Sequence, residues 1–500
     1  MTRIQALLVL LAVALSGCAV PPSSSIETVT LHSPDSPLVA VRLLFDAGSI
    51  HDPAGKEGLA ALTGLMVGEA GSAQREYKEI VDALYPMAAG IEVTTDREIT
   101  TITGEIHREK LDEYIGLLKE VVLDPGFREA DFERNRQQLK SYLTTTLRAS
   151  NDELLGLEAL QQVIFSGQHP YRTAPEGTVE GLEAITIDDV RAFYAENYTQ
   201  ARLLLGVAGG YPDGFVESLQ SELAALPAGT DASVELPEPA AVEGRQFTLI
   251  EKPTSSVGIH FGYPLPITRA DDDYFALMVA NSFLGEHRTF HGRLMQQLRG
   301  KRGLNYGDYS YIEYYYAPPF TNTPTPNVPR RHQYFSVWVR PVVPNTAHFA
   351  LRNAIYEVER LVERGMTQEE FELTRDYLVN YSKLWAQTLP DRLGFLMDSH
   401  FYGTEYFIDE IDARLAALTL EEVNAAIAKY INAADFHAVL VTDGAAELQA
   451  AIEAGEPSPM IYNAPPPPEV AEEDKSIEGL AVDAAEFRTI AVDTMFQSGS

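Results

Sequence analysis

The sequence has little cysteine and few basic residues. One cysteine occurs in 500 residues, so no disulfide can form within the chain. Lysine and arginine total 38 against 72 aspartate and glutamate residues, a formal net charge of −34. Nucleic acids are bound by clustered cations, so this balance argues against a nucleic-acid partner. The hydrophobic fraction of 45% is typical of a folded chain, and the length is enough for two to four domains of about 150 residues.

Long apolar runs are absent except at the N-terminus, which has the pattern of a secretory signal. Arg3 is its only charge, and the apolar run 6–15 is too short to span a membrane. The run ends in the motif LSGC, with Cys18 last, which is similar to the bacterial lipobox. We predict a signal peptide at 1–17, a lipid on Cys18 and a tether at 18–26. The alternative is a plain secretory signal with an incidental cysteine.

A lipid on the first residue of the mature chain implies where the protein works. Acyl chains anchor a protein to a membrane without spanning it. We therefore predict a periplasmic protein that is held by its lipid alone. The outer membrane of a Gram-negative bacterium is the favoured location, because Ala19 follows the cysteine.

The chain contains one pattern twice. Residues 182–198 align with 415–430, and residues 126–139 align with 365–378, in the same order. Both segments of the first pair begin with Thr-x-x-acid, a capping box that opens a helix. These boxes are Thr186 with Asp189 and Thr419 with Glu422. Two ordered matches at similar offsets indicate a tandem of two related domains.

The predicted fold class is α+β, with two similar domains that each have a mixed sheet and helices packed on one face. The N-terminal domain spans 27–225 and the C-terminal domain 246–450, joined by a linker at 226–245 that is rich in Pro, Gly and acidic residues. A Pro-rich acidic tail follows at 451–500, and its apolar segment 487–496 is expected to dock on the protein. The expected strands are 38–45, 98–105, 202–208, 257–263, 334–342 and 437–442.

Several segments resemble the insulinase/pitrilysin family of zinc peptidases, whose smaller members include the mitochondrial processing peptidase subunits. Residues 46–72 are similar to the family's opening segment, and residues 168–186 to its His-Pro-Tyr loop. Residues 261–287 and 294–307 are similar to its C-terminal domain. The resemblance covers 27–450 and implies a clamshell of two domains.

The family's chemistry needs a zinc motif that this chain lacks. In H-x-x-E-H, two histidines bind zinc and the glutamate polarises the attacking water. Ala61, Gly64 and Leu65 stand at these positions. The third ligand, an acidic residue, is expected near 139–141, and no Asp or Glu occurs anywhere in 134–151. We therefore predict no metal site in this chain and no peptidase activity of the chain alone.

The second half keeps the family's Arg/Tyr pair, as Arg299 and Tyr306 in LRGKRGLNY. In active relatives this pair holds the substrate backbone across the chamber from the zinc. In some of them one subunit binds zinc and its partner has the pair. The resemblance thus implies a zinc-bearing partner subunit and a peptide substrate. In the alternative, Arg299 pairs with a neighbouring carboxylate and Tyr306 packs at a strand start.

Two other functions stay open. One is a stand-alone peptide-binding or scaffold lipoprotein in envelope maintenance. The other is a peptidase with a remodelled metal site, because His287 and His291 have i, i+4 spacing, although an exposed turn or helix start explains them more simply. The sequence has no G-x-S-x-G elbow and no P-loop.

The stretch 309–331 is rich in tyrosine and then in proline. It is expected either to contact a peptide or partner, or to be a strand with buried tyrosines followed by a hairpin insertion. The net charge favours basic or neutral peptides over acidic ones.

Overall fold

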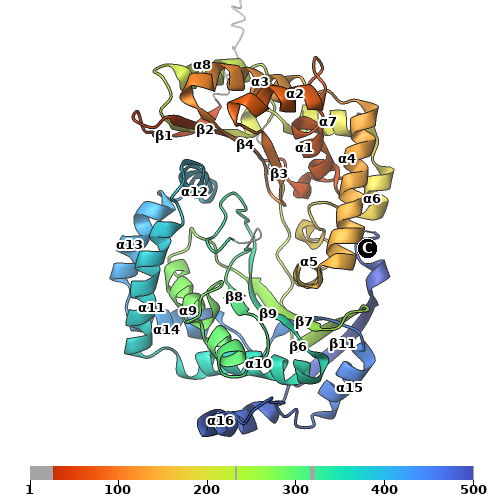
Figure 1. Cartoon of the computed structure of the whole chain (residues 1–500), viewed down its shortest axis with the longest axis vertical. Helices are drawn as coiled ribbons and strands as arrows, with labels where there is room; N and C mark the ends of the chain where they lie inside the picture. Colours follow the sequence, from red (N-terminus) through yellow and green to blue (C-terminus); the bar gives the residue numbers. More distant parts are fainter. Residues whose placement is uncertain (1–25, 231–232, 316–320, 499–500) are drawn as a thin grey trace, which may run out of the picture.

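Two open mixed sheets, one in each half of the chain, form the framework of the protein (Figure 1). The computed structural model describes residues 26–230, 233–315 and 321–498; the predicted signal and Cys18 lie outside them. The N-terminal sheet contains β1 (Glu27–His32), β2 (Leu38–Phe45), β3 (Glu92–Thr95), β4 (Thr100–His107) and β5 (Leu203–Gly209). The C-terminal sheet contains β6 (Arg245–Glu251), β7 (Val257–Leu265), β8 (Asp308–Tyr311), β9 (Gln333–Val342), β10 (Phe436–Thr442) and β11 (Ala484–Ala491).

The two sheets have the same topology. The strand order is β1-β5-β2-β4-β3 in the first, and β6-β10-β7-β9-β8 in the second with β11 added beside β6. The β1–β5 and β6–β10 pairs are parallel, and the other pairs of these two five-strand sets are antiparallel. The α+β tandem is therefore confirmed, and each expected strand is found within two residues at either end.

The helices of each half lie mostly over the outer face of its sheet (Figure 1). Those of the N-terminal half are α1 (Leu59–Gly68), α2 (Tyr77–Leu84), α3 (Leu111–Leu123), α4 (Glu129–Ser141), α5 (Asp152–Ile164), α6 (Val179–Ala184), α7 (Ile187–Asn197) and α8 (Phe215–Leu223). Those of the C-terminal half are α9 (Tyr274–Gly285), α10 (Ala347–Arg364), α11 (Gln368–Tyr381), α12 (Leu389–Tyr402), α13 (Phe407–Ala417), α14 (Leu420–Tyr430), α15 (Ala445–Ala454) and α16 (Pro468–Glu478). The described residues include no helix that is both long and apolar enough to cross a membrane.

The repeated capping boxes are formed as predicted. The amide of Asp189 donates to Thr186 Oγ1 over 3.3 Å, and the carboxylate of Asp189 accepts from the amide of Thr186 over 2.8 Å, at the start of α7. Thr419 and Glu422 make the same two bonds at the start of α14, over 3.3 and 2.8 Å. Each box satisfies two amides that the helix itself leaves unpaired.

Each half also covers the inner face of the other half's sheet. Helix α5 packs on β7, β9 and β10, while α12 packs on β1, β2 and β5. Glycines permit this close approach: a Cβ at Gly156 of α5 would lie 2.4 Å from the His260 ring, and one at Gly206 of β5 would lie 2.6 Å from Met397 of α12. The two halves are thus packed together as a clamshell through exchanged helices, as Figure 1 shows.

Ion pairs reinforce this packing, and the C-terminal half supplies the cations. Arg330 is fully buried and binds both carboxylate oxygens of Asp96, with Nη2 to Oδ1 at 2.9 Å. Its Nη1 donates to Gln161 of α5 over 2.6 Å. The other Arg and Lys pairs between the halves include Arg331–Glu98, Arg340–Glu153 and Lys252–Asp152. A buried charge needs such a partner, because burial removes its hydration.

The His-Pro-Tyr segment lies at the same seam between the halves. His169 Nε2 lies 2.8 Å from His332 Nδ1, which belongs to the C-terminal half. The buried Tyr171 hydroxyl donates to Glu98, the carboxylate that also pairs with Arg331. The segment that resembles a family loop in sequence therefore helps to fix the two halves relative to each other.

The C-terminal segment joins both halves. Strand β11 runs parallel to β6, and the chain then crosses to the N-terminal half, where Met495 and Phe496 are buried in its core. There the amides of Val179 and Glu180 donate to the carbonyls of Phe496 and Gln497, both over 2.9 Å. The expectation that the apolar segment 487–496 docks on the protein is confirmed.

The buried pair predicts a large effect of Asp96→Asn on stability. The substitution leaves Arg330 buried without a counter-charge, which costs about 3 kcal/mol or more. The matched control is Asp82→Asn, which breaks an exposed pair with Lys78 on α2 and changes stability by less than about 1 kcal/mol. Urea unfolding followed by circular dichroism measures both. Equal midpoints for the two variants would show that the Arg330–Asp96 pair does not stabilise the halves.

Candidate functional site

The helix at the positions of the zinc motif, α1, is fixed at its start by the side chain of Asp52. Asp52 Oδ2 accepts a hydrogen bond from the amide of Gly58 and Oδ1 accepts one from the amide of Ala60, both over 2.7 Å. Burial raises the pKa of Asp52 to about 8. Gly58 has φ of +104° and precedes the helix, which begins at Leu59. The start of α1 is therefore closely determined, and with it the orientation of the three positions that matched the zinc motif.

These three positions have side chains that cannot bind a metal. Ala61 and Gly64 are buried, and Leu65 packs against the core of the N-terminal half. Strand β3 fills the space beside them: a Cβ at Gly64 would lie 2.6 Å from Thr95 Oγ1, and a Cβ at Gly68 would lie 2.4 Å from Val93 Cγ2. The helix approaches the sheet so closely that a glutamate or histidine at Gly64 does not fit.

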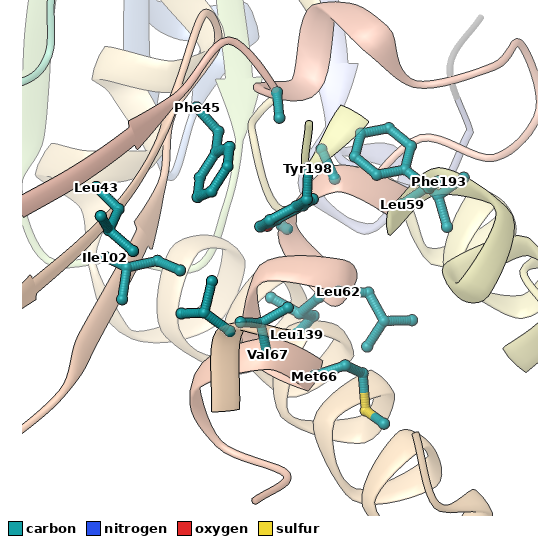
Figure 2. Close-up of a cluster of buried hydrophobic side chains, with 14 of the residues drawn as sticks. Leu43, Phe45, Leu59, Leu62, Met66, Val67, Ile102, Leu139, Phe193 and Tyr198 are labelled. Atoms are coloured by element: carbon teal, nitrogen blue, oxygen red, sulfur yellow. The ribbon is translucent and has the colours of Figure 1, made fainter. Parts of the chain in front are cut away.

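The region of the third ligand is equally apolar. Leu139 of α4 is buried, and Figure 2 shows it beside Leu62 and Val67 of α1. Asn135 of α4 is buried too, and its Nδ2 lies 3.5 Å from Met66 Sδ. In the described part of the chain, no group of three or more His, Cys, Asp or Glu side chains is arranged to hold a metal ion. The residues present do not fit the zinc that the resemblance implies, and packing has replaced the ligands.

A substitution at Gly64 tests this tight packing. Gly64→Ala is expected to lower the free energy of unfolding by about 1–3 kcal/mol, because the new methyl group overlaps Thr95. Gly116→Ala on α3 is the control, since a Cβ there meets nothing within 4 Å, and it should raise stability by about 0.5–1 kcal/mol. Thermal and urea unfolding give both values. A stabilised Gly64→Ala would mean that α1 and β3 are not in close contact.

Arg299 and Tyr306 lie together at the free edge of the C-terminal sheet. Arg299 is on a helical turn, Met295–Gly300, and Tyr306 is in the loop that leads into β8. The guanidinium carbon of Arg299 lies 4.4 Å from the centre of the Tyr306 ring and 4.9 Å from that of Phe290. Tyr306 is 69% exposed, and Arg299 forms no ion pair among the described residues, its hydrogen bond being to Met295 Sδ. The alternative with a paired arginine and a packed tyrosine is therefore wrong; the substrate-binding role stays a prediction.

The segment around Arg299 is held by the tail. Arg302 is buried, with Nε 2.8 Å from Asp474 and Nη2 3.0 Å from Glu473, both on α16. Lys301 also pairs with Glu473, at 3.3 Å. The acidic run of the tail thus supplies the counter-charges of Lys301 and Arg302, which the sequence did not reveal.

A buried carboxyl group next to the pair was also missed from the sequence. Asp308 begins β8 and is fully buried; its Oδ1 accepts from Asn305 Nδ2 over 2.6 Å. Burial raises the pKa of Asp308 to about 8, so it is mostly neutral at pH 7. Arg340 lies 5.6 Å from the Tyr306 ring and pairs with Glu153 of α5 at 2.7 Å. The helix α5 therefore connects this edge of the sheet to the N-terminal half.

The two spaced histidines do not form a metal site. His287 is buried, contrary to the expected exposed turn, and its Nδ1 lies 2.7 Å from the Tyr311 hydroxyl. Burial lowers the pKa of His287 to about 3, which keeps the ring neutral. His291 is exposed, and both residues lie in the turns after α9. The two histidines therefore do not lie on one face of a helix.

The described part of the tyrosine-rich stretch is mainly structural. Tyr309 and Tyr311 are buried in β8, and their rings contact His287. Tyr314 stacks on Arg330, with its ring centre 3.4 Å from the guanidinium carbon. These contacts fit the strand with buried tyrosines; Tyr316 lies outside the described residues.

Two family models match the chain. Residues 27–169 match the model described as Insulinase (Peptidase family M16), and residues 184–378 match the model described as Peptidase M16 inactive domain. Fold and site together define a protein of the zinc-peptidase class whose metal-binding positions have become apolar. The chain belongs to peptidase family M16, as a member without the catalytic residues.

Individual relatives agree with this assignment. The Non-peptidase homolog YmxG of Helicobacter pylori is 24% identical over 394 residues, which are 78% of this chain and 85% of that protein. A crystal structure of a peptidase M16 inactive domain from Pseudomonas fluorescens has a TM-score of 0.73 at 24% identity, covering 84% of this chain and 96% of that chain. Mitochondrial-processing peptidase subunit alpha of Solanum tuberosum is 24% identical over 212 residues, 42% of this chain and 40% of that protein.

Proposed function

We propose that this chain is the non-catalytic subunit of a heterodimeric zinc peptidase, and that it supplies Arg299 and Tyr306 for substrate binding to a zinc-bearing partner. The observation that supports the proposal most strongly is the contrast between the two matched sites. The zinc positions are filled by packed apolar groups, whereas Arg299 and Tyr306 stand stacked and without an ion pair at the edge of a sheet. Relatives named as subunits alpha and beta of the mitochondrial-processing peptidase also support a two-subunit enzyme.

In this proposal the partner has an intact H-x-x-E-H motif and binds the zinc, and the substrate is a peptide. A cation and a phenol donor near the scissile carbonyl stabilise the negative charge that grows in the transition state. The complex is periplasmic and is attached to the membrane by the lipid on Cys18. A stand-alone peptide-binding or scaffold lipoprotein is the competing function, and it differs because it needs no zinc-bearing partner.

The contribution of Arg299 is tested in the complex. Arg299→Ala should lower kcat/KM of the co-purified heterodimer by about one to three orders of magnitude while assembly survives. Arg191→Ala is the control, because it removes an exposed arginine of α7 that pairs only with Asp188 three residues away and bonds the Phe127 carbonyl. Fluorogenic peptide cleavage and gel filtration measure activity and assembly, and zinc analysis should find the metal in the partner. Homodimers alone, together with a partner that cleaves equally well without this chain, would contradict the proposal.

The anchor is tested by Cys18→Ser. Without the thiol no lipid can be attached, so the variant should move from the membrane pellet to the soluble periplasmic fraction and lose metabolic labelling with palmitate. Ser24→Ala in the predicted tether is the control and should stay in the pellet. A Cys18→Ser protein that still sediments with membranes after a high-salt wash would argue against lipid anchoring.

A further inference from the structure

Phe290 extends the Arg/Tyr pair to a cluster of three, although it lies outside the LRGKRGLNY motif. It comes from the turn after α9, and its ring centre lies 4.9 Å from the guanidinium carbon of Arg299, against 4.4 Å for Tyr306. Both rings are exposed, Phe290 by 66% and Tyr306 by 69%. Two exposed aromatic rings beside one cation do not contribute to a core, and such groups are enriched where proteins bind partners. We call Phe290, Arg299 and Tyr306 the aromatic–arginine cluster.

The guanidinium of the cluster has donors that no described carboxylate uses. Its only polar contact among the described residues is with Met295 Sδ, 4.0 Å from Nη1. The neighbouring cations all form ion pairs: Lys301 and Arg302 pair with α16, and Arg340 pairs with Glu153.

A neighbouring carboxyl group, that of Asp308, forms no ion pair with Arg299. Asp308 is buried and bonded to Asn305, and it stays mostly protonated at neutral pH because burial raises its pKa to about 8. The cluster therefore presents, between exposed aromatic surfaces, one positive charge that forms no ion pair with a described residue. A planar guanidinium binds a carboxylate through two parallel hydrogen bonds, a geometry that a neutral amide cannot match.

We infer that the aromatic–arginine cluster binds a carboxylate group of the substrate peptide, next to an apolar side chain that contacts Phe290 and Tyr306. The inference rests on one part of the proposed function, namely that the substrate peptide binds at this edge of the sheet. It replaces the preference for basic or neutral peptides that the net charge predicts, because the local charge at the cluster is positive. The carboxylate has two sources, the C-terminus of the peptide or an Asp or Glu side chain.

The test compares peptides that differ in one carboxylate. The full-length mature chain is titrated into a fluorescein-labelled peptide that ends in phenylalanine, as the free acid and as the amide, and anisotropy gives Kd. A second pair of amidated peptides has Glu or Gln before the phenylalanine. At least one carboxylate should improve binding about tenfold or more, and the pair in which it does so identifies the source.

Three variants test whether the cluster causes the difference in affinity between the acid and amide peptides. Arg299→Ala should bind acid and amide equally, at the affinity of the amide. Phe290→Ala should weaken both peptides about fivefold and keep the discrimination, because it removes apolar contact only. Tyr85→Ala removes another exposed aromatic ring, 84% exposed at the end of α2, and should change nothing.

The outcomes separate this inference from the proposed function. Equal affinity of both peptide pairs, or no binding of any peptide at millimolar concentration, overturns carboxylate recognition. If Arg299→Ala still discriminates while it abolishes cleavage by the heterodimer, the proposed function survives and the inference fails. Discrimination by the chain together with an unaffected heterodimer supports the inference and contradicts the proposed role of Arg299 in cleavage.

Discussion

The exchange of helices between the halves is the constraint on which the rest of the structure depends. A sheet with helices on one face leaves its other face open, and here α5 and α12 close both open faces with a helix from the opposite half. The halves cannot separate without exposing apolar surface and the buried charge of Arg330. The edge of the C-terminal sheet that includes Arg299 and Tyr306 is therefore held at a defined position relative to α5, through Arg340 and Glu153.

The degenerate zinc site shows how packing changes when functional groups are lost from the interior of a domain. Metal ligands are polar and need a cavity and an outer layer of hydrogen bonds. Once Ala, Gly and Leu occupy these positions, a cavity would only reduce stability. Close contact of α1 with β3 at Gly64 and Gly68 removes it, and Leu139 continues the same apolar cluster on α4. At the three positions without ligands, the helix thus packs directly against β3 and α4.

The sequence is most informative where structure is local. Capping boxes and alternating strands depend on neighbours within a few residues, so Thr186, Thr419 and the strands could be predicted. The pairs Arg330–Asp96 and Arg302–Asp474 join residues far apart in the chain and leave no local pattern. The expectation of an exposed turn at His287 is wrong for the same reason, because the tyrosines that bury this residue come from β8. Phe290 could not be recognised, since a single aromatic residue in a turn gives no indication of the arginine beside it.

The position of the C-terminal segment has a consequence for folding during synthesis. Strand β11 and the residues after it are synthesised after both halves. Until then β6 is an edge strand with unpaired backbone groups, and the N-terminal core lacks Met495 and Phe496. Strand β11 thus joins the two halves only after both have been synthesised. A chain that ends before residue 484 contains both domains and the whole Arg/Tyr motif, yet it has an exposed sheet edge at which it is prone to aggregate.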